Sequence, residues 1–241
     1  GRAAGVFLPV IRGVGSNSIS VGDESNIATY VDGIYQGDPF STWIDLFEVE
    51  RVEVLRGPQG TIFGRNATGG LINVITPDPS YDARARFVAK AATMRTSISD
   101  TDMMAAVGSA MPLRESEDFV KDLNYGGKVV GYHVGSLRGK LMVEPSDSAK
   151  LVLISEYFER RGSENVYQPY MGNTAGKSFS GAIVPTGPWE QSTDLVPVLN
   201  IRRYNFALQT TFTFSGFDLQ TTSSFANNPT EQDTDSDSSN I

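Results

Sequence analysis

The chain has 241 residues, of which 20 are basic and 28 acidic, so its formal net charge is -8. Nucleic-acid-binding proteins gather lysine and arginine on one face to neutralise phosphates, and this acidic chain without a basic cluster is a poor candidate for that class. Because cysteine is absent, thiolate zinc sites, iron–sulfur clusters and disulfides are excluded. No apolar run in the sequence reaches the roughly 18–20 residues of a transmembrane helix.

The N-terminal residues predict a small α+β unit. Asp32-Gly33 separates two β-rich runs, and aspartate followed by glycine fills the two positive-φ positions of a type I′ hairpin turn. Pro77 and Pro79 break the pattern, so the unit is expected to end near Ser80. The predicted elements are the hairpin in Ile27–Tyr35, a possible helical turn at Trp43–Phe47, and strands at Arg51–Arg56 and Leu71–Ile75.

A glycine-rich loop lies between the last two predicted strands. A phosphate-binding P-loop requires a lysine directly after its last glycine, but Gly69 is followed by Gly70 and Leu71. A dinucleotide fingerprint requires three spaced glycines that open a helix, and Gly13-Val14-Gly15 supplies only the first half. The loop is therefore interpreted as tight turns that need positive φ or close backbone contact, and nucleotide binding is not expected.

The segment LRGPQGTIFGRNATGGLINVIT, from Leu55 to Thr76, resembles the signature of the plug domain of TonB-dependent outer-membrane receptors. Ile11–Gly15 and Tyr30–Tyr35 match that pattern in the same order. In this family the plug is a globular domain inside a barrel of about 22 strands. The resemblance implies a β-rich fold, with a small α+β plug domain followed by antiparallel transmembrane β-barrel strands of an incomplete barrel. It divides the chain into an N-terminally truncated plug at 1–80 and a C-terminally truncated barrel at 81–241.

The resemblance also implies site residues. It places charges of the plug, such as Arg12, Glu53 and Arg56, against charged residues of the barrel wall. The alternative is that they are ordinary surface charges of a small domain. The plug motif and plug–barrel contacts are predicted to be Arg12, Gly13, Asp32, Gly33, Glu53, Arg56, Gly57, Pro58, Gly60, Gly64, Gly69, Gly70 and Asn73.

Segments of alternating polarity follow the plug. In Ala83–Met94, Arg84, Arg86 and Lys90 share one face and apolar side chains the other, so these three cations are expected to line the barrel lumen. In Tyr204–Phe214, aromatic residues and a leucine alternate with Asn, Gln and Thr. The other predicted strands are Leu137–Glu144, Phe217–Asn227 with weaker alternation, and Met103–Met111 and Leu151–Glu159 with poor alternation.

A soluble antiparallel sandwich also has one apolar face per strand, so strand pattern alone does not separate it from a barrel. Turn lengths favour the barrel: Glu144–Ala149 and Ser215-Gly216 are short, and the connection from Gly162 to Arg203 is long. Between Met103–Met111 and Leu137–Glu144 a strand of opposite direction is required. Pro112–Leu123 is highly charged, so either 128–134 supplies this strand or the chain has lost it.

The remaining candidate sites favour ordinary roles. His133, the one histidine, has no neighbours in sequence that indicate a metal or catalytic site, no nucleophile motif occurs, and an enzyme is not expected. The acidic tail Asp233–Asp237 lacks the glycine of a calcium loop, so a solvated loop is expected, and neither metal nor cofactor is predicted. Tyr167, Tyr170 and Trp189 are possible ligand contacts in the long loop, or they pack that loop against itself.

The resemblance implies a function without covalent chemistry. It is the TonB-dependent active transport of a scarce ligand, foremost an iron–siderophore complex, across the bacterial outer membrane. The implied partners are TonB of the inner membrane, an extracellular ligand such as a ferric siderophore, and outer-membrane lipid. The alternative is a soluble β-rich carbohydrate-binding or carbohydrate-active domain, which would remain in the soluble fraction.

Overall fold

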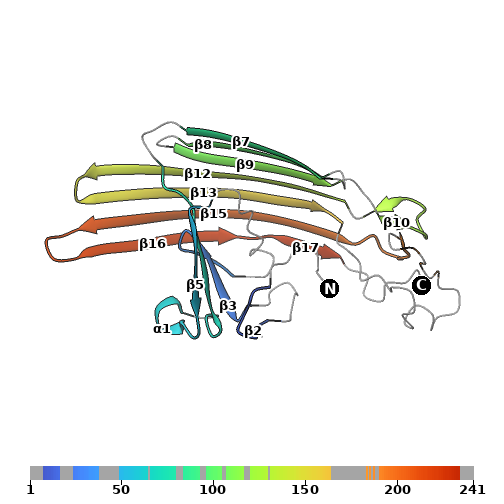
Figure 1. Ribbon diagram of the computed structural model, residues 1–241, viewed down its shortest axis with the longest axis horizontal. Coiled ribbons are helices and arrows are strands. Elements are labelled where there is room, and N and C mark those ends of the chain that lie inside the picture. Colours follow the sequence, from blue (N-terminus) through green and yellow to red (C-terminus); the bar gives the residue numbers. More distant parts are fainter. Residues whose placement is uncertain are drawn as a thin grey trace.

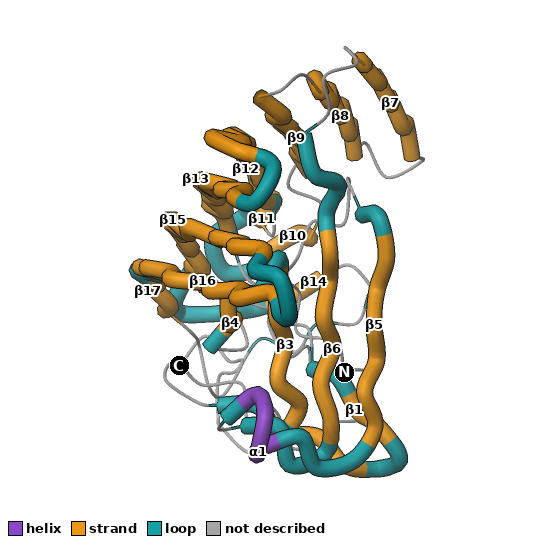
Figure 2. Tube along the Cα trace, turned by 90° about the vertical axis from the view of Figure 1, so that its left-hand side faces the viewer, coloured by secondary structure: helices purple, strands orange, loops and turns teal. Residues whose placement is uncertain are grey.

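The computed structural model describes residues 8–16, 24–37, 49–64, 66–79, 84–92, 96–104, 107–116, 120–129, 131–163, 183, 185, 187 and 190–233. Two main sheets account for most of these residues. The larger sheet, which contains β7, β12 and β15, has strands that run side by side along the long axis of the molecule. The strands of the smaller, N-terminal sheet, such as β3 and β5, run across them (Figure 1). Seen from the side, the strands of the larger sheet form a curved row beside the N-terminal sheet (Figure 2).

The N-terminal sheet has four strands in the order β4-β3-β6-β5. The pair β3–β4 is antiparallel, β3–β6 is parallel and β5–β6 is antiparallel. Its core contains Ala28, Ala67 and Leu71, with Tyr30 and Phe63 packed against them. The elements of this part are β1 Val10–Ile11, β2 Val14–Gly15, β3 Ile27–Val31, β4 Ile34–Gln36, β5 Arg51–Arg56, α1 Gly60–Phe63 and β6 Gly70–Ile75.

The predicted hairpin at Asp32-Gly33 is confirmed. Asp32 and Gly33 have φ values of 48° and 75°, as a type I′ turn requires at its two central positions. The predicted strands Arg51–Arg56 and Leu71–Ile75 correspond to β5 and β6. Trp43–Phe47 lies outside the described residues.

The second sheet, which we call the wall, has eight strands in the order β16-β15-β13-β12-β9-β8-β7, with β17 paired to β15 beyond the end of β16. Neighbouring strands are antiparallel. Its strands are β7 Arg84–Ala92, β8 Thr96–Met104, β9 Val107–Ser116, β12 Tyr132–Ser146, β13 Ala149–Gly162, β15 Val198–Thr213, β16 Asp218–Asn227 and β17 Thr230–Asp233.

The prediction of one strand at Met103–Met111 is wrong. Those residues end β8 and begin β9, and the chain reverses between Met104 and Val107. Both alternatives left open for this region, a strand at 128–134 and the loss of a strand, are therefore also wrong, because β9 pairs with both β8 and β12. The error arose because Thr96–Asp102 is too polar to stand out as a strand, and in the sheet its neighbours satisfy its backbone groups.

The alternation predicted for the later strands is confirmed. On β12, Leu137 and Leu141 are exposed, while Arg138 and Lys140 are buried. On β15, Phe206 and Leu208 are exposed and Asn205 is buried. Apolar side chains thus cover the outer face of the wall, and charged side chains are buried on its inner face beside apolar ones such as Val152 and Ile154. An exposed apolar face opposite buried charges is the reverse of a water-soluble sheet.

Candidate functional site

The N-terminal sheet contacts the wall at the β3–β4 turn, and we call this contact region the junction. The Asp32 carboxylate accepts hydrogen bonds from the Thr76 amide at 2.8 Å and the Thr76 hydroxyl at 2.7 Å. The Asp32 carbonyl oxygen accepts a hydrogen bond of 2.6 Å from Nε2 of Gln209 on β15. Beside this turn, Ile34 packs against Val152 and Ile154 of the wall. The turn is therefore joined to the wall by polar and apolar contacts together.

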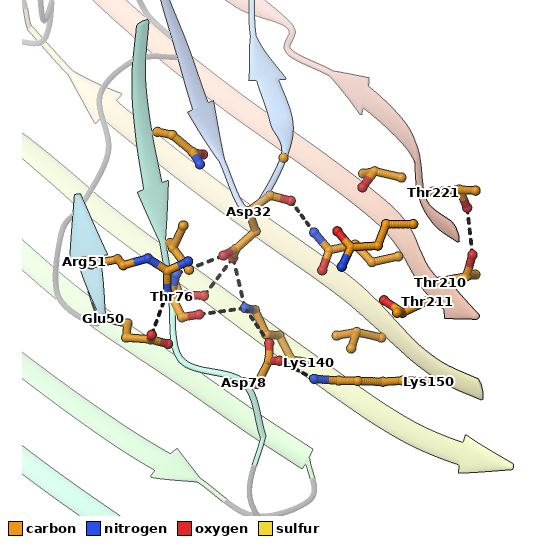
Figure 3. A pocket seen from close by; sticks show the side chains of 17 residues that line it. Asp32, Glu50, Arg51, Thr76, Asp78, Lys140, Lys150, Thr210, Thr211 and Thr221 are labelled. Carbon is orange, nitrogen blue, oxygen red and sulfur yellow. Dashed lines mark hydrogen bonds and ion pairs between the residues drawn. The ribbon is translucent and has the colours of Figure 1, made fainter. Parts of the chain in front are cut away.

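Lys140 of β12 provides the central charge of the junction (Figure 3). Its Nζ lies 3.2 Å from the Asp32 carboxylate and donates a hydrogen bond of 3.1 Å to the carbonyl oxygen of Thr76. The side chains of Lys140 and Asp32 are only 5% and 3% exposed. A charge pair so far withdrawn from water is tolerated because its members are paired and hydrogen-bonded.

The segment that leaves β6 is held by a second lysine. Asp78 lies 3.7 Å from Lys140 and 2.6 Å from Lys150 of β13. Lys150 and Asp78 are partly exposed, at 36% and 47% of their side chains. Solvent screens such a pair, so it contributes less than the buried pair of Lys140 and Asp32.

A polar cavity of about 480 Å³ adjoins this junction. Both sheets line it, and its wall side carries Gln209, Thr211, Gln220 and Thr222. Figure 3 shows the lysines and acidic side chains of the junction at this cavity. Its lining offers hydrogen-bond donors and acceptors but no nucleophile–base arrangement. Among the described residues, no group of three or more His, Cys, Asp or Glu side chains is arranged to hold a metal ion.

A second buried charge cluster lies further along the inner face of the wall. Glu156 of β13 is bound by Arg138 of β12 at 3.0 Å and by Arg203 of β15 at 2.8 Å. Each of the three side chains is at most 7% exposed. The three residues link neighbouring strands, so the inner face carries paired charges where the outer face carries apolar side chains.

The glycine-rich loop closes on itself. The Gly57 and Gln59 amides donate to the carbonyl oxygens of Gly69 and Ala67 at 3.2 and 2.8 Å. These amides are therefore not available to a phosphate, which agrees with the interpretation of the loop as structural. Gly70 has a φ of +148°, and a Cβ there would lie 2.5 Å from the carbonyl oxygen of Leu55. A Cβ at Gly69 would lie 2.6 Å from side-chain atoms of Ile27 and of Val14. Four other glycines of the predicted motif have nothing within 4 Å of such a Cβ: Gly13, Gly57, Gly60 and Gly64.

Aromatic side chains fix the same loop to β3 and β4. The Tyr30 hydroxyl donates a hydrogen bond of 2.8 Å to the carbonyl oxygen of Phe63, and the Tyr35 hydroxyl accepts one of 2.6 Å from Asn66. Burial raises the pKa of Tyr30, and the nearby Tyr35 raises it further. The Tyr30 hydroxyl thus remains a protonated donor.

The three charged residues predicted to contact the barrel wall lie outside the Lys140–Asp32 junction. Arg12 is exposed, with a φ of 52°, at the tip of the β1–β2 hairpin. Glu53 pairs with Arg51 of its own strand at 2.8 Å and accepts a hydrogen bond of 3.1 Å from Asn73. The hydrogen bond from Arg51, and then that from Asn73, lowers the pKa of Glu53. Arg56 is exposed, as is Pro58 beside it.

The other predicted residues cannot be compared side chain by side chain. Arg84, Arg86 and Lys90 lie in β7, but their side chains are outside the described part of the structure. Tyr167, Tyr170, Trp189 and most of the tail 233–237 lie outside the described residues altogether. His133 is exposed at the start of β12.

A small sheet stands apart from the wall at the end where the long connections lie (Figure 1). It consists of β10 Val120–Asp122, β11 Lys128–Val129 and β14 Glu190–Gln191, in the order β11-β10-β14. Asp122 is fully buried, and its carboxylate accepts hydrogen bonds from the amides of Asn124 and Tyr125 at 2.9 and 3.0 Å. Gln191 and Thr193 donate to the same carboxylate at 3.0 and 2.8 Å. Burial alone would raise the pKa of Asp122, but these hydrogen bonds outweigh it and lower the pKa.

Several residues of the junction were missed in the sequence. Lys140 lies in the predicted strand Leu137–Glu144, as does Arg138 of the second charge cluster, but the sequence indicates no partners for them. Thr76 ends the segment that resembles the plug signature, but nothing in the sequence indicates its contact with Asp32. Asp78, Lys150 and Gln209 belong to no motif. The available signal was that a charged residue on the inner face of a membrane strand needs a partner, and the sequence did not identify that partner.

Comparison with known proteins agrees with these features. The family model described as TonB-dependent Receptor Plug Domain matches residues 1–71. The pesticin receptor of Yersinia enterocolitica is 45% identical over 58 residues, which are 24% of this chain and 8% of the relative. The catecholate siderophore receptor Fiu of Escherichia coli K12 is 42% identical over 62 residues, or 26% of this chain and 8% of the relative.

Solved structures extend the similarity to the wall. The ferric yersiniabactin uptake receptor FyuA from Yersinia pestis matches with a TM-score of 0.70 and 20% identity, over 95% of this chain and 37% of that chain. The siderophore receptor PiuA from Acinetobacter baumannii matches with a TM-score of 0.67 and 16% identity, over 93% of this chain and 31% of that chain. The chain thus spans about a third of the length of these structures.

Three observations indicate the same fold. They are the sequence motifs, the N-terminal sheet that lies across the wall, and the similarity to solved receptors. The predicted fold class is confirmed, and the family is one of receptors. Residues 1–71 thus match the plug domain of TonB-dependent receptors, and the fold of the chain is that of a plug followed by antiparallel barrel strands, as in the solved receptors.

Proposed function

We propose that the protein takes part in TonB-dependent uptake of an iron–siderophore complex across the bacterial outer membrane. The observation that carries the proposal is the plug domain of residues 1–71 held against an inner barrel face by the Lys140–Asp32 junction. The names of similar proteins, such as the catecholate siderophore receptor Fiu and the ferric yersiniabactin uptake receptor FyuA, support the ligand class.

The exposed apolar face supports a location in the outer membrane. It includes large side chains from several neighbouring strands, which would be costly to expose to water. Among the described residues, no helix is long and apolar enough to cross a membrane. The outward-facing residues are Leu137, Leu141, Val143, Leu153, Phe206, Leu208, Phe212, Phe214, Phe217, Leu219 and Phe225.

The mechanism requires no covalent chemistry on the ligand. The plug, proposed to span 1–80, blocks the lumen of the barrel formed by 81–241 and the strands that complete it. Ligand binding on the outer side favours a plug conformation that TonB engages from the periplasm, and the ligand shifts this equilibrium only by its differential affinity for the two states. Arg84, Arg86 and Lys90 are proposed to line the lumen, and Tyr167, Tyr170 and Trp189 to contact the ligand.

Uptake of radiolabelled iron tests the proposal. A strain lacking the gene is compared with its parent in iron-limited medium, using catecholate, hydroxamate and phenolate siderophores as separate iron carriers. We expect uptake from at least one carrier to be lost in the deletion strain, restored by the gene, and absent when TonB is removed. Unchanged uptake from all carriers, or uptake independent of TonB, would contradict the proposal.

A further inference from the structure

The outward face of β13 and β15 changes character in successive rows. Leu153 lies opposite Leu208 in the sheet register, and two rows further along, Tyr157 lies opposite Tyr204. The two tyrosine rings have centroids 5.2 Å apart. In the next row Glu159 lies opposite Arg202, and Arg161 follows on the same face. The order is therefore apolar, aromatic and then charged.

The aromatic pair marks one boundary of the membrane. Phe214, at the tight turn, lies ten positions after Tyr204. Ten positions span about 33 Å along a strand. At a tilt of roughly 40° this is about 25 Å along the membrane normal, which is the usual height of the apolar band of a barrel. Phe214 and Phe217 form a stacked pair, with ring centroids 4.9 Å apart, at the other boundary.

The charged row lies on the extracellular side of Tyr157 and Tyr204. At the opposite end of the wall, β12 and β13 are joined by a tight turn at Asp147-Ser148, and β15 and β16 by another at Ser215-Gly216. At this end the connections are long, since 163–197 separates β13 from β15. Short periplasmic turns and long extracellular loops are typical of outer-membrane barrels. The charged row therefore faces the headgroups of the outer leaflet.

Two arginines in this row are held in place and still exposed. Glu159 is bound by Arg161 at 2.6 Å and by Arg202 at 3.1 Å. The arginine side chains are 59% and 51% exposed, and Glu159 is 19% exposed. Each guanidinium has five N–H donors, so most of them remain directed away from the one carboxylate. The group has a net charge of +1, and His133 lies beside Arg161 in the register.

We propose that Arg161 and Arg202 form a binding site for the phosphorylated glycolipid headgroup of the outer leaflet. Arginine matches phosphate oxygens with paired hydrogen bonds, and Glu159 reduces the freedom of both side chains before the lipid arrives. The apolar band directly below receives the acyl chains, and Tyr157 and Tyr204 lie at the level between chains and headgroup. The site rests on the proposed outer-membrane location, but not on which ligand is transported.

Lipid binding to the purified receptor tests the site. Bisphosphorylated lipid A is titrated against the wild type, the double variant R161Q/R202Q and the control R51Q, whose arginine also pairs with glutamates but lies on the plug. We expect the double variant to bind lipid A at least about tenfold more weakly and R51Q to bind like the wild type. Dephosphorylated lipid A should bind equally weakly to all three.

Other outcomes overturn the proposal. Equal binding of lipid A to wild type and double variant would exclude these arginines. Equal binding of the dephosphorylated lipid would show recognition of acyl chains alone, and displacement of lipid A by the same concentration of inorganic phosphate would show an unspecific anion site. Siderophore-dependent iron uptake, measured on the same double variant, is expected to remain, so failure of the lipid site is distinguishable from failure of the proposed transport function.

Discussion

Lys140 and Asp32 show how one charge pair can join two sheets. The carboxylate is satisfied by Thr76 as well as by the lysine, and Lys140 also reaches the Thr76 carbonyl oxygen. Removal of one partner leaves the other charge buried without compensation, which costs far more than the loss of a surface pair. The junction thus holds the β3–β4 turn and the segment leaving β6 at one place on the wall.

Lys140→Met is expected to destabilise this junction by about 3–5 kcal/mol, because it leaves the buried Asp32 carboxylate unpaired. Lys150→Met is the matched control, since its partner is half-exposed, and it is expected to cost no more than about 1 kcal/mol. Thermal unfolding of the purified receptor measures both. Equal effects of the two substitutions would contradict the assignment of Lys140 as the main contact.

At the scale of single residues, the sequence predicted conformation better than contact. Asp32 and Gly33 were assigned correctly to a turn because the φ values of a type I′ turn restrict the residues that can form it. The role of Asp32 in the junction depends on Gln209, which lies 177 residues away. No local rule connects residues so distant in sequence.

In the small sheet of β10, β11 and β14, a buried carboxylate likewise joins segments that are distant in the sequence. Parallel pairing joins Lys121 to Glu190 and Asp122 to Gln191, and the Asn124 side chain donates to the Thr193 carbonyl oxygen at 3.0 Å. The hydroxyl of Tyr125 donates to the carbonyl oxygen of Asp194. The connection between β9 and β12 and the connection between β13 and β15 are therefore held together by a buried carboxylate.

Acid is expected to release this sheet. The folded state lowers the pKa of Asp122 below its usual value of 3.8, so the unfolded segment binds the proton more readily. The stability that the carboxylate contributes is present above about pH 4 and is lost as the pH falls through the lowered pKa. Hydrogen exchange at the Asn124 and Tyr125 amides, measured from pH 6 downwards, should show loss of protection below pH 4.

Asp122→Asn removes the titrating group and should remove the acid-dependent step, with lower protection at all pH values. Asp147→Asn, in an exposed turn, serves as the control and should leave the step unchanged. Protection that persists at low pH in the wild type would show that the backbone pairing of β10 and β14 alone holds the two connections together.

Strands were recognised in the sequence where side chains alternate clearly, but their ends were not. β12 begins at Tyr132 and β15 at Val198, whereas the predicted strands begin at Leu137 and Tyr204. β12 and β15 alternate between apolar and polar residues, so their existence and facing were evident, whereas β16 alternates more weakly and is exposed throughout. β8 carries Thr96–Asp102, in which polar residues stand at nearly every position, and its neighbours rather than its own pattern define it. The physical reason is that ladder hydrogen bonds depend on the partner strand as much as on the side chains.

At the scale of the whole molecule, the distribution of side chains is that of a membrane barrel wall. Apolar residues face outward and paired charges face the plug, as on β12 with Leu137 and Lys140. The alternative of a soluble sandwich would require a second sheet over the apolar face, and among the described residues none covers it. A charged side chain on the outer face should be most costly near Leu208. This residue lies about midway between the aromatic pair Tyr157 and Tyr204 and the aromatic pair Phe214 and Phe217.

Leu208→Arg is expected to lower the free energy of unfolding of the receptor in a bilayer by about 2–4 kcal/mol, because it places a charge near the middle of the bilayer. Phe217→Arg changes an exposed apolar residue at the boundary and is expected to cost at most about 1 kcal/mol. Denaturant unfolding of the receptor folded into lipid bilayers compares the two. An equal cost at both positions would contradict the depth assigned to the band.

The sequence by itself determined the plug motif, the turn at Asp32-Gly33 and the outward face of most strands, because backbone conformation and the two-residue period of a strand are local properties. Only the tertiary structure decided that β9 completes the wall, that Lys140 receives Asp32, and that Asp122 receives Gln191 and Thr193. These contacts depend on which segments lie side by side after folding, and buried charges and ladder hydrogen bonds find their partners only there.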